Sequence, residues 1–144
     1  VIGFGMSQDR NHLAPVMNAH GFSIEWLLLP PGAGVSRHHL VDKQVLMVYR
    51  GEVEIMAEGT DAPALFQAKG RIEGWDSYAM PAHVWRSYRN NTSKEAVMLV
   101  MTPGDHSKRI VWSDEVVQAA AKANRAIDAN GFVAPKNFVD RSQR

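Results

Sequence analysis

Apolar residues recur in short runs between residues 23 and 103, and proline or glycine ends most of these runs. The segment SIEWLLL begins at Ser23 and stops at Pro30-Pro31-Gly32, while residues 52–57, EVEIMA, alternate polar and apolar side chains. Such alternation is typical of a strand with one buried face. We expect strands over residues 23–29, 35–40, 45–49, 52–57, 64–67, 76–80, 85–89 and 96–102, a hairpin at Arg50-Gly51, and loops at 61–63 and 70–74. Short strands separated by turns predict a β-sandwich or barrel.

The chain outside this region has a different character. Residues 1–22 show no periodicity and are interrupted by Pro15 and three glycines, which predicts an irregular N-terminal arm. In residues 104–144, Ser113 is suited to cap a helix, and the two acidic residues after it suit the positive end of the helix dipole. We therefore divide the chain into an arm over 1–22, a β-barrel over 23–103, and a C-terminal helix with a tail over 104–144.

The C-terminal helix is expected to be about four turns long. Its apolar face is formed by Val116, Ala120, Ala123 and Ile127, and Asn130-Gly131 is a helix stop signal. We expect this small apolar face to pack on the outside of the barrel. The apolar residues expected to fix the tail to the body are Phe132, Val133, Phe138 and Val139.

Composition excludes several classes of function. Sixteen basic residues nearly balance fifteen acidic ones, so the net charge of +1 gives no reason to expect nucleic acid or an anionic membrane as a partner. The absence of cysteine excludes disulfides, thiolate nucleophiles and sulfur-ligated zinc. The sequence shows no signal peptide and no apolar run of transmembrane length, and we expect a cytoplasmic protein.

Two segments carry a family resemblance, and the first is residues 32–51. From Gly32, five residues lead to His38, Leu40 lies two further on, Gln44 follows, and six residues separate it from Gly51. This resembles the first motif of the cupin superfamily, in which a glycine and five residues precede His-x-His. Three or four residues then lead to a glutamate, and six more to a glycine.

The second segment, residues 74–90, reads GWDSYAMPAHVWRSYRN. It resembles the second cupin motif, a glycine followed by Pro-x-Gly, two residues, a histidine, three residues and an asparagine. Pro81 and Asn90 fit this pattern, whereas His83 takes the second glycine position and Arg86 the histidine position. The resemblance covers about residues 23–103 and implies an all-β fold, the cupin double-stranded β-helix or jelly-roll barrel.

The resemblance also defines a metal site that this sequence does not reproduce. Metal-binding cupins hold iron, manganese, nickel or zinc with three histidines and a glutamate. Here only His38 matches, because Leu40 cannot ligate, Gln44 offers a neutral oxygen, and Arg86 is a permanent cation that repels a divalent ion. We expect no metal cofactor in this domain. If Fe, Mn, Ni or Zn does bind, the fallback ligands are His38, His39 and His83, although adjacent strand residues such as His38 and His39 face opposite ways.

Arg86 directs attention to the inside of the barrel. A buried arginine needs an acceptor, so we expect either an internal carboxylate, with Glu54 and Asp76 as candidates, or an anionic ligand. On the inner surface, a small acidic or aromatic molecule would meet the hydrogen-bond donors of the predicted ligand-binding set: His38, Gln44, Arg86 and Tyr88. His38 is also the candidate catalytic base.

Three functional interpretations stay open, and with them whether the chain is an enzyme. The first is the accessory barrel, for assembly or small-anion binding, of a bicupin similar to gentisate 1,2-dioxygenase; the missing ligands, the start at Val1 and the C-terminal helix suit its C-terminal half. The second is a single-domain, metal-free cupin enzyme acting on a small carboxylate or phenolate. The third is a metal-dependent cupin dioxygenase with unusual ligands.

Exposed strand edges favour association with a second copy or a second cupin domain. In this interpretation the N-terminal arm covers such an edge with its apolar residues Phe4, Leu13, Val16 and Met17.

Overall fold

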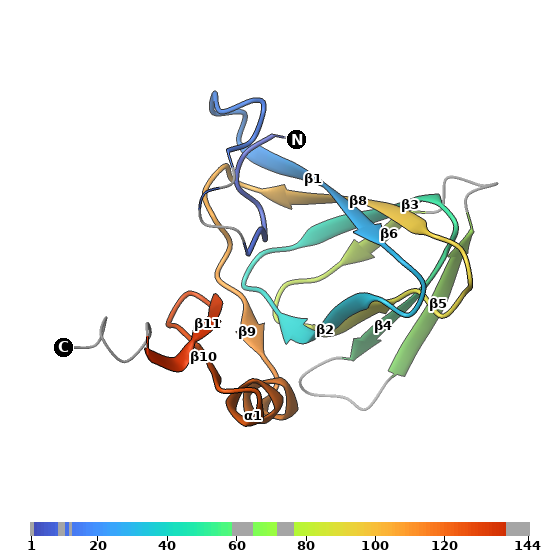
Figure 1. The fold of residues 1–144 in the computed structure, drawn as a ribbon. Coiled ribbons are helices and arrows are strands. Elements are labelled where there is room, and N and C mark those ends of the chain that lie inside the picture. The colour runs from blue at the N-terminus through green and yellow to red at the C-terminus, as the bar shows by residue number, and fades with distance from the viewer. Residues whose placement is uncertain (1, 9–10, 12, 59–64, 72–76, 138–144) are drawn as a thin grey trace.

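Two antiparallel β-sheets face each other and enclose the core of the protein (Figure 1). The first sheet has the strand order β1 (Phe22–Leu29), β8 (Ala96–Pro103), β3 (Gln44–Arg50), β6 (Ser77–Met80). The second sheet has the order β5 (Leu65–Arg71), β4 (Glu52–Glu58), β7 (Trp85–Arg89), β2 (Gly34–His39), β9 (Val111–Trp112). The computed structural model describes the chain except residues 1, 9–10, 12, 59–64, 72–76 and 138–144, and only the backbone of 65–71. The predicted all-β jelly-roll class is confirmed.

Strand alternation decides which side chains enter the core. In β3, Gln44, Leu46 and Val48 are buried, whereas Val45 and Tyr49 between them are exposed. Burial of the inward apolar side chains supplies most of the stabilisation, since the hydrophobic effect scales with the apolar area removed from water. The core cluster contains Leu29, Leu46, Val48, Val53, Ile55, Met80, Tyr88, Ala96, Met98 and Val100.

The connection at Arg50-Gly51 is a corner between the sheets and not the predicted hairpin. β3 pairs with β6 and β8 in the first sheet, whereas β4 pairs with β5 and β7 in the second. Gly51 makes the corner with a left-handed φ of 80°, and a Cβ there would lie 2.8 Å from the Cα of Ala96. Glycine meets both demands, the positive φ and the close approach.

The N-terminal arm reaches the outer edge of the first sheet. Ile2 donates to the carbonyl of Ile24 at 3.0 Å and accepts from the Ile24 amide at 2.9 Å, which covers part of the edge of β1. Leu13 and Met17 do not share this role, because both side chains are largely exposed. The arm therefore covers an edge of its own barrel through Ile2.

The C-terminal region departs from the prediction. Helix α1 (Asp114–Lys122) has nine residues, with Asn124 just after it in the left-handed region at φ 55°. A hairpin follows, in which β10 (Arg125–Ile127) pairs with β11 (Val133–Pro135). Asn130-Gly131 lies in the turn of this hairpin, where it was expected to stop a helix. The expected four-turn helix is therefore wrong, because the same Asn-Gly signal also favours tight β-turns.

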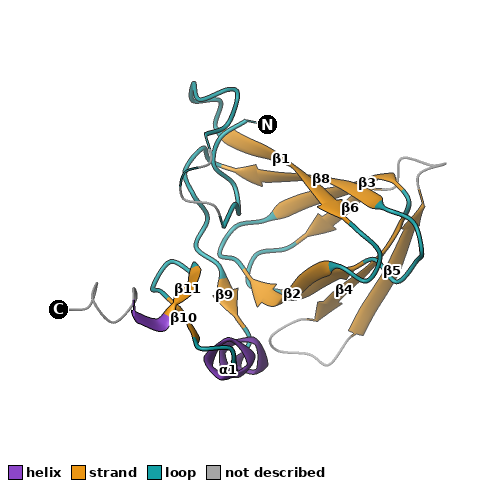
Figure 2. Cartoon of the chain, viewed as in Figure 1, coloured by secondary structure: helices purple, strands orange, loops and turns teal. Residues whose placement is uncertain are grey.

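The helix also begins and packs differently from the prediction. Ser113 occupies the N-cap position, but its hydroxyl donates to the Glu115 carboxylate at 3.1 Å and caps no backbone amide. No residue of α1 is buried, so its apolar stripe makes little contact with the barrel. Figure 2 shows the helix beside the β10–β11 hairpin, at the end of β9. Within the described residues no helix has the length and apolar character needed to cross a membrane.

Some predicted features lie outside the described residues. These are the loops at 61–63 and 72–74, the strand ends at 64 and 76, and the tail residues Phe138 and Val139.

Candidate functional site

The four side chains predicted to share the barrel interior are all buried. His38 of β2 lies opposite Arg86 of β7 in the strand register, and Tyr88 follows Arg86 by two residues on the same face. Gln44 comes from β3 in the facing sheet. The sequence therefore placed these side chains correctly inside the barrel, and the structure brings them into contact.

Gln44 is the centre of a buried hydrogen-bond network. Its side-chain oxygen accepts from Arg86 Nη1 at 2.8 Å and from the Tyr88 hydroxyl at 3.2 Å. Its side-chain nitrogen donates to Thr102 Oγ1 at 3.1 Å and to the sulfur of Met6 at 3.3 Å. We call these five residues the Gln44 network. An amide both donates and accepts here, which a glutamate carboxylate in the same position cannot do.

Arg86 finds its remaining acceptors on the backbone. Its Nη2 donates to the carbonyl of Pro81 at 2.6 Å, and its Nε donates to the carbonyl of Val84 at 3.1 Å. Glu54, proposed above as a partner, lies between the buried Val53 and Ile55, so strand alternation turns it to the outer face. That expectation is wrong, and Asp76 lies outside the described residues. Burial lowers the pKa of Arg86, and Tyr88 opposes this shift. Neutral oxygens satisfy all three donating nitrogens of the guanidinium.

His38 is a neutral imidazole enclosed by aromatic rings. Its Nδ1 lies 2.8 Å from the Ser36 carbonyl, which can only accept, so Nδ1 carries the proton and Nε2 the lone pair. Nε2 is buried without a hydrogen-bond partner in the described structure. The ring packs against Tyr88 and Trp112 at centroid distances of 5.7 and 5.6 Å. Burial, reinforced by the positive charge of Arg86, lowers the pKa of His38 to about 4. Its protonation state suits a base, but no part of it reaches solvent.

The fallback metal ligands do not converge. His39 points to the other face of β2, where it meets Trp85 edge-on at 4.6 Å and lies 6.2 Å from the ring of His83. His83 is in a turn with a left-handed φ of 60°. Across the residues that the structure describes, no group of three His, Cys, Asp or Glu side chains could hold a metal ion. The inner cluster offers one imidazole, one amide and a guanidinium, a donor set that does not fit the metals bound by cupins.

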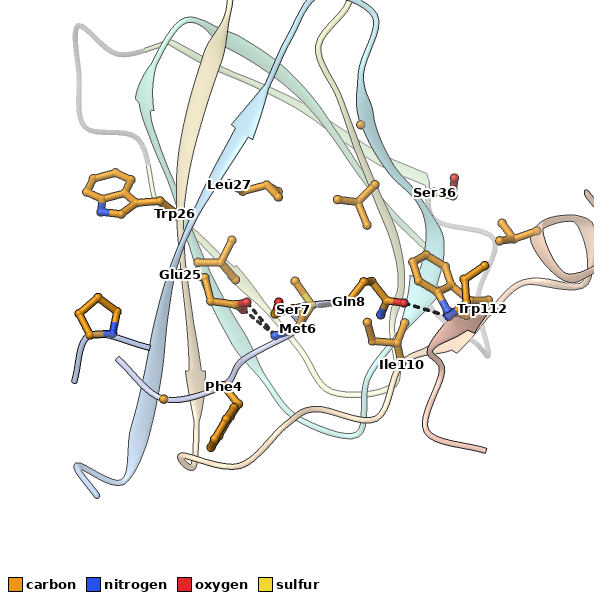
Figure 3. A pocket seen from close by; sticks show the side chains of 17 residues that line it. Phe4, Met6, Ser7, Gln8, Glu25, Trp26, Leu27, Ser36, Ile110 and Trp112 are labelled. Carbon is orange, nitrogen blue, oxygen red and sulfur yellow. Dashed lines mark hydrogen bonds between the residues drawn. The ribbon is translucent and has the colours of Figure 1, made fainter. Parts of the chain in front are cut away.

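A separate cavity of about 730 Å³ opens beside this cluster (Figure 3). Residues of β1 and β2 line it, together with the arm and the segment leading into β9. Both carboxylate oxygens of Glu25 accept from the backbone amide of Met6 at 2.8 Å, which fixes the arm across the cavity. The lining residues are Gly3, Phe4, Met6, Ser7, Gln8, Pro15, Glu25, Trp26, Leu27, Gly34, Val35, Ser36, Val100, Ile110, Trp112, Val116 and Val133.

Sequence reasoning missed Glu25, Met6 and Trp112 as residues of the site. Glu25 had a signal, because it is a charged residue at an inward position of the apolar strand SIEWLLL. Met6 had none, since the arm has no periodicity. None of the four predicted interior residues lines the cavity, although Trp112 contacts both it and His38.

Comparison with known proteins identifies the fold. No protein-family model and no curated protein matches the chain. Among solved structures, the Drosophila melanogaster CENP-C cupin domain matches with a TM-score of 0.51 and 16% identity, covering 55% of this chain and 59% of that one. Recombinant oxalate oxidase in complex with glycolate matches with a TM-score of 0.58 and 22% identity, covering 71% and 57%. The capsular polysaccharide assembling protein CapF from Staphylococcus aureus matches with a TM-score of 0.51 and 11% identity, covering 56% of this chain and 22% of that one.

These similarities show a cupin fold. The chain spans somewhat more than half the length of the first two solved chains, and the identities are too low to transfer an activity. The neighbours also differ in function by their names, so the interior of this barrel has to indicate what it does.

Proposed function

We propose that this cupin barrel binds a small molecule without a metal, in the cavity beneath the N-terminal arm. The observation that carries the proposal is the cavity itself, about 730 Å³ of mostly apolar lining around the carboxylate of Glu25. Ligand sites in proteins typically measure about 300–1,000 Å³ and combine apolar walls with a few polar groups that orient the ligand.

The metal-independent part of the proposal rests on the Gln44 network. A guanidinium at the histidine position of the motif places a fixed positive charge beside the place where cupins hold their metal. The same network argues against an acidic ligand bound to Arg86, because three protein oxygens already accept hydrogen bonds from that side chain. The anion-binding role predicted for these residues therefore has less support than a role in stabilising the barrel.

The lining indicates the chemistry of the ligand. Phe4, Leu27, Val35 and Trp112 offer apolar and aromatic surface, and Glu25 is the charged residue among the described lining positions. A carboxylate repels a carboxylate ligand and attracts an amine or a hydroxyl donor. We therefore propose a small aromatic molecule that carries an amine or hydroxyl group, in contrast to the acidic molecule expected from Arg86.

Calorimetric titration with benzylamine, benzyl alcohol and benzoate tests the proposal, because these probes share a ring and differ in charge. We expect benzylamine to bind most tightly and benzoate most weakly. The Glu25→Gln variant should reduce the difference between benzylamine and benzoate. Leu27→Trp should fill the cavity and abolish binding of all three, whereas Leu28→Trp, at the next position and facing outward, should not.

Two results would contradict this assignment. If benzoate bound most tightly and lost its affinity in an Arg86→Met variant, the ligand would occupy the inner cluster. If none of the probes bound at millimolar concentration while the protein stayed folded, the cavity would not be a site for aromatic amines or alcohols.

A second candidate function is the accessory barrel of a bicupin, with a role in assembly. The observation in its favour is the apolar outer face of the first sheet, which carries Phe22, Trp26 and Leu28 exposed on β1 alone. The gene provides the test: a reading frame that continues upstream into a second barrel with an intact His-x-His motif supports this function, and a start codon immediately before Val1 contradicts it.

A further inference from the structure

The outer face of the first sheet is almost entirely apolar. Its outward positions alternate with buried ones such as Leu29, Leu46 and Met98. The polar exceptions are Ser77 and, at the end of β3, Arg50, which a bulge sets opposite the outward Val97. The remaining outward residues are uncharged. They are Phe22, Ile24, Trp26 and Leu28 of β1; Val97, Leu99, Met101 and Pro103 of β8; Val45, Met47 and Tyr49 of β3; and Ala79 of β6. We call this surface the apolar face.

The outer face of the second sheet shows what a solvated face of this barrel is like. Arg37 pairs with Glu58 at 2.9 Å and lies over the ring of Trp85 at 4.7 Å, and Glu54 occupies another outward position. Antiparallel sheets with one solvated face normally alternate apolar and polar residues in this way. The strands of the first sheet lack that alternation, which indicates that both of its faces are buried in the working protein.

The apolar face combines a raised end with a hollow end. At the raised end, Trp26, Leu28 and Tyr49 are 45%, 58% and 45% exposed, and the rings of Trp26 and Tyr49 meet edge-on at 5.3 Å. The other end contains a hollow of about 780 Å³. The outward residues lining it are Phe22, Ile24, Val45, Ala79, Met101 and Pro103, and Lys43, just before β3, lines it as well. The strand register sets Ile24, Met101 and Val45 side by side, and Trp26, Leu99 and Met47 side by side in the next outward row.

This shape is complementary to itself. A two-fold axis lying between two such faces, perpendicular to the strands, reverses the strand direction of the second copy. The raised end of each copy then lies over the hollow of the other, as an isologous interface requires. The charged pair of Arg50 and Glu95 lies at the end of β3, where an interface normally has its polar rim.

We propose that two copies of this chain pack their apolar faces together as a two-fold homodimer. The four strands have eight, eight, seven and four residues, and at a spacing of about 4.8 Å they give a projected area of roughly 430 Å². Protruding side chains raise the accessible area above this projection, towards the roughly 800 Å² per partner that a standard stable interface buries. The dimer does not depend on the proposed ligand site, since Leu28 and Tyr49 do not line that cavity.

Light scattering coupled to gel filtration, with sedimentation equilibrium for affinity, tests the dimer. The chain has a mass of 16.0 kDa, so the expected particle is twice that mass. Leu28→Lys and Tyr49→Lys place a charge on exposed positions of the apolar face and should each weaken dimerisation at least 100-fold. Val117→Lys, at a similarly exposed apolar position on α1, should leave the dimer intact. If a lysine variant loses its folded circular dichroism, Leu28→Ser replaces it with the same expectation.

Two results would overturn the proposal. One is a monomer for the unmodified chain at 0.1 mM. That result would leave a second barrel of a longer chain as the occupant of the face. The other is a dimer that persists in both Leu28→Lys and Tyr49→Lys, which would place the contact on a different surface.

Discussion

Replacing Gln44 by methionine should be one of the most damaging conservative substitutions in the barrel. The two side chains have similar length and volume, so the change leaves little cavity and removes only hydrogen-bonding groups. Arg86 Nη1 and the Tyr88 hydroxyl lose their shared acceptor, and Thr102 Oγ1 loses a donor. All three groups are buried, so water cannot readily replace the amide.

The magnitude follows from the groups left without partners. A buried hydrogen bond to a charged group contributes about 1.5–3 kcal/mol, and an unsatisfied buried hydroxyl costs about 1–3 kcal/mol. We expect the free energy of unfolding to fall by about 4 kcal/mol in Gln44→Met. Each kcal/mol lowers the melting temperature by about 3 °C in a domain of this size, so Tm should fall by roughly 12 °C.

A double-mutant cycle separates the network from simple packing. Arg86→Met removes the buried charge that Gln44 satisfies, so the variant with both substitutions should be more stable than the sum of the two single effects predicts, by about 2 kcal/mol. Urea unfolding followed by circular dichroism measures all four proteins. Gln118→Met, the same substitution at an exposed position of α1, is the control and should change stability by less than about 0.5 kcal/mol. A cost below about 1 kcal/mol for Gln44→Met, or strict additivity in the cycle, would refute the account of the network.

Two further predictions concern pH and a corner glycine. Burial lowers the pKa of His38 from 6.5 to about 4, so below pH 6.5 the unfolded chain binds a proton that the folded chain accepts only near pH 4. The free energy of unfolding should therefore decrease by about 3 kcal/mol as the pH is lowered from 6.5 to 4. Urea unfolding at several pH values should show a flatter curve for His38→Gln, and identical curves would argue against the shift. Gly51→Ala should cost about 2 kcal/mol or more and Gly32→Ala only about 1, because both need a left-handed φ but only Gly51 also approaches Ala96. Thermal melts measure both variants, and equal losses of stability would mean that the backbone relaxes enough to relieve the contact between residue 51 and Ala96.

Most of the barrel could be predicted because its strands alternate and its breaks are glycines and prolines. Inward positions such as Leu46 and Ile55 follow directly from a period of two. Strand pairing did not follow, since nothing local distinguishes a hairpin at Arg50-Gly51 from a corner between two sheets. The end of the C-terminal helix was misplaced for a similar reason: the alanine-rich segment favours helix, and the left-handed turn at Asn124 that ends it has a signal no stronger than that of Asn130-Gly131.

The site divides in the same way. Motif spacing put His38, Gln44, Arg86 and Tyr88 in one interior, because the strand register of the fold is tied to that spacing. Their partners were not predictable. The acceptors of Arg86 are an amide and two backbone carbonyls, which sequence cannot reveal, whereas the expected carboxylate of Glu54 faces outward. The cavity depends on an arm whose position is set by tertiary contacts alone.

The Gln44 network also has a consequence for the kinetics of folding. Gln44 lies 42 residues from Arg86, 58 from Thr102 and 38 from Met6, so its bonds join both sheets and the arm across long stretches of chain. Contacts this distant in sequence form only after most of the chain has been brought together, which is slow. Interactions that form after the transition state leave the folding rate nearly unchanged and slow the unfolding rate. We therefore expect the Gln44 network to slow the unfolding of the barrel more than it speeds its folding.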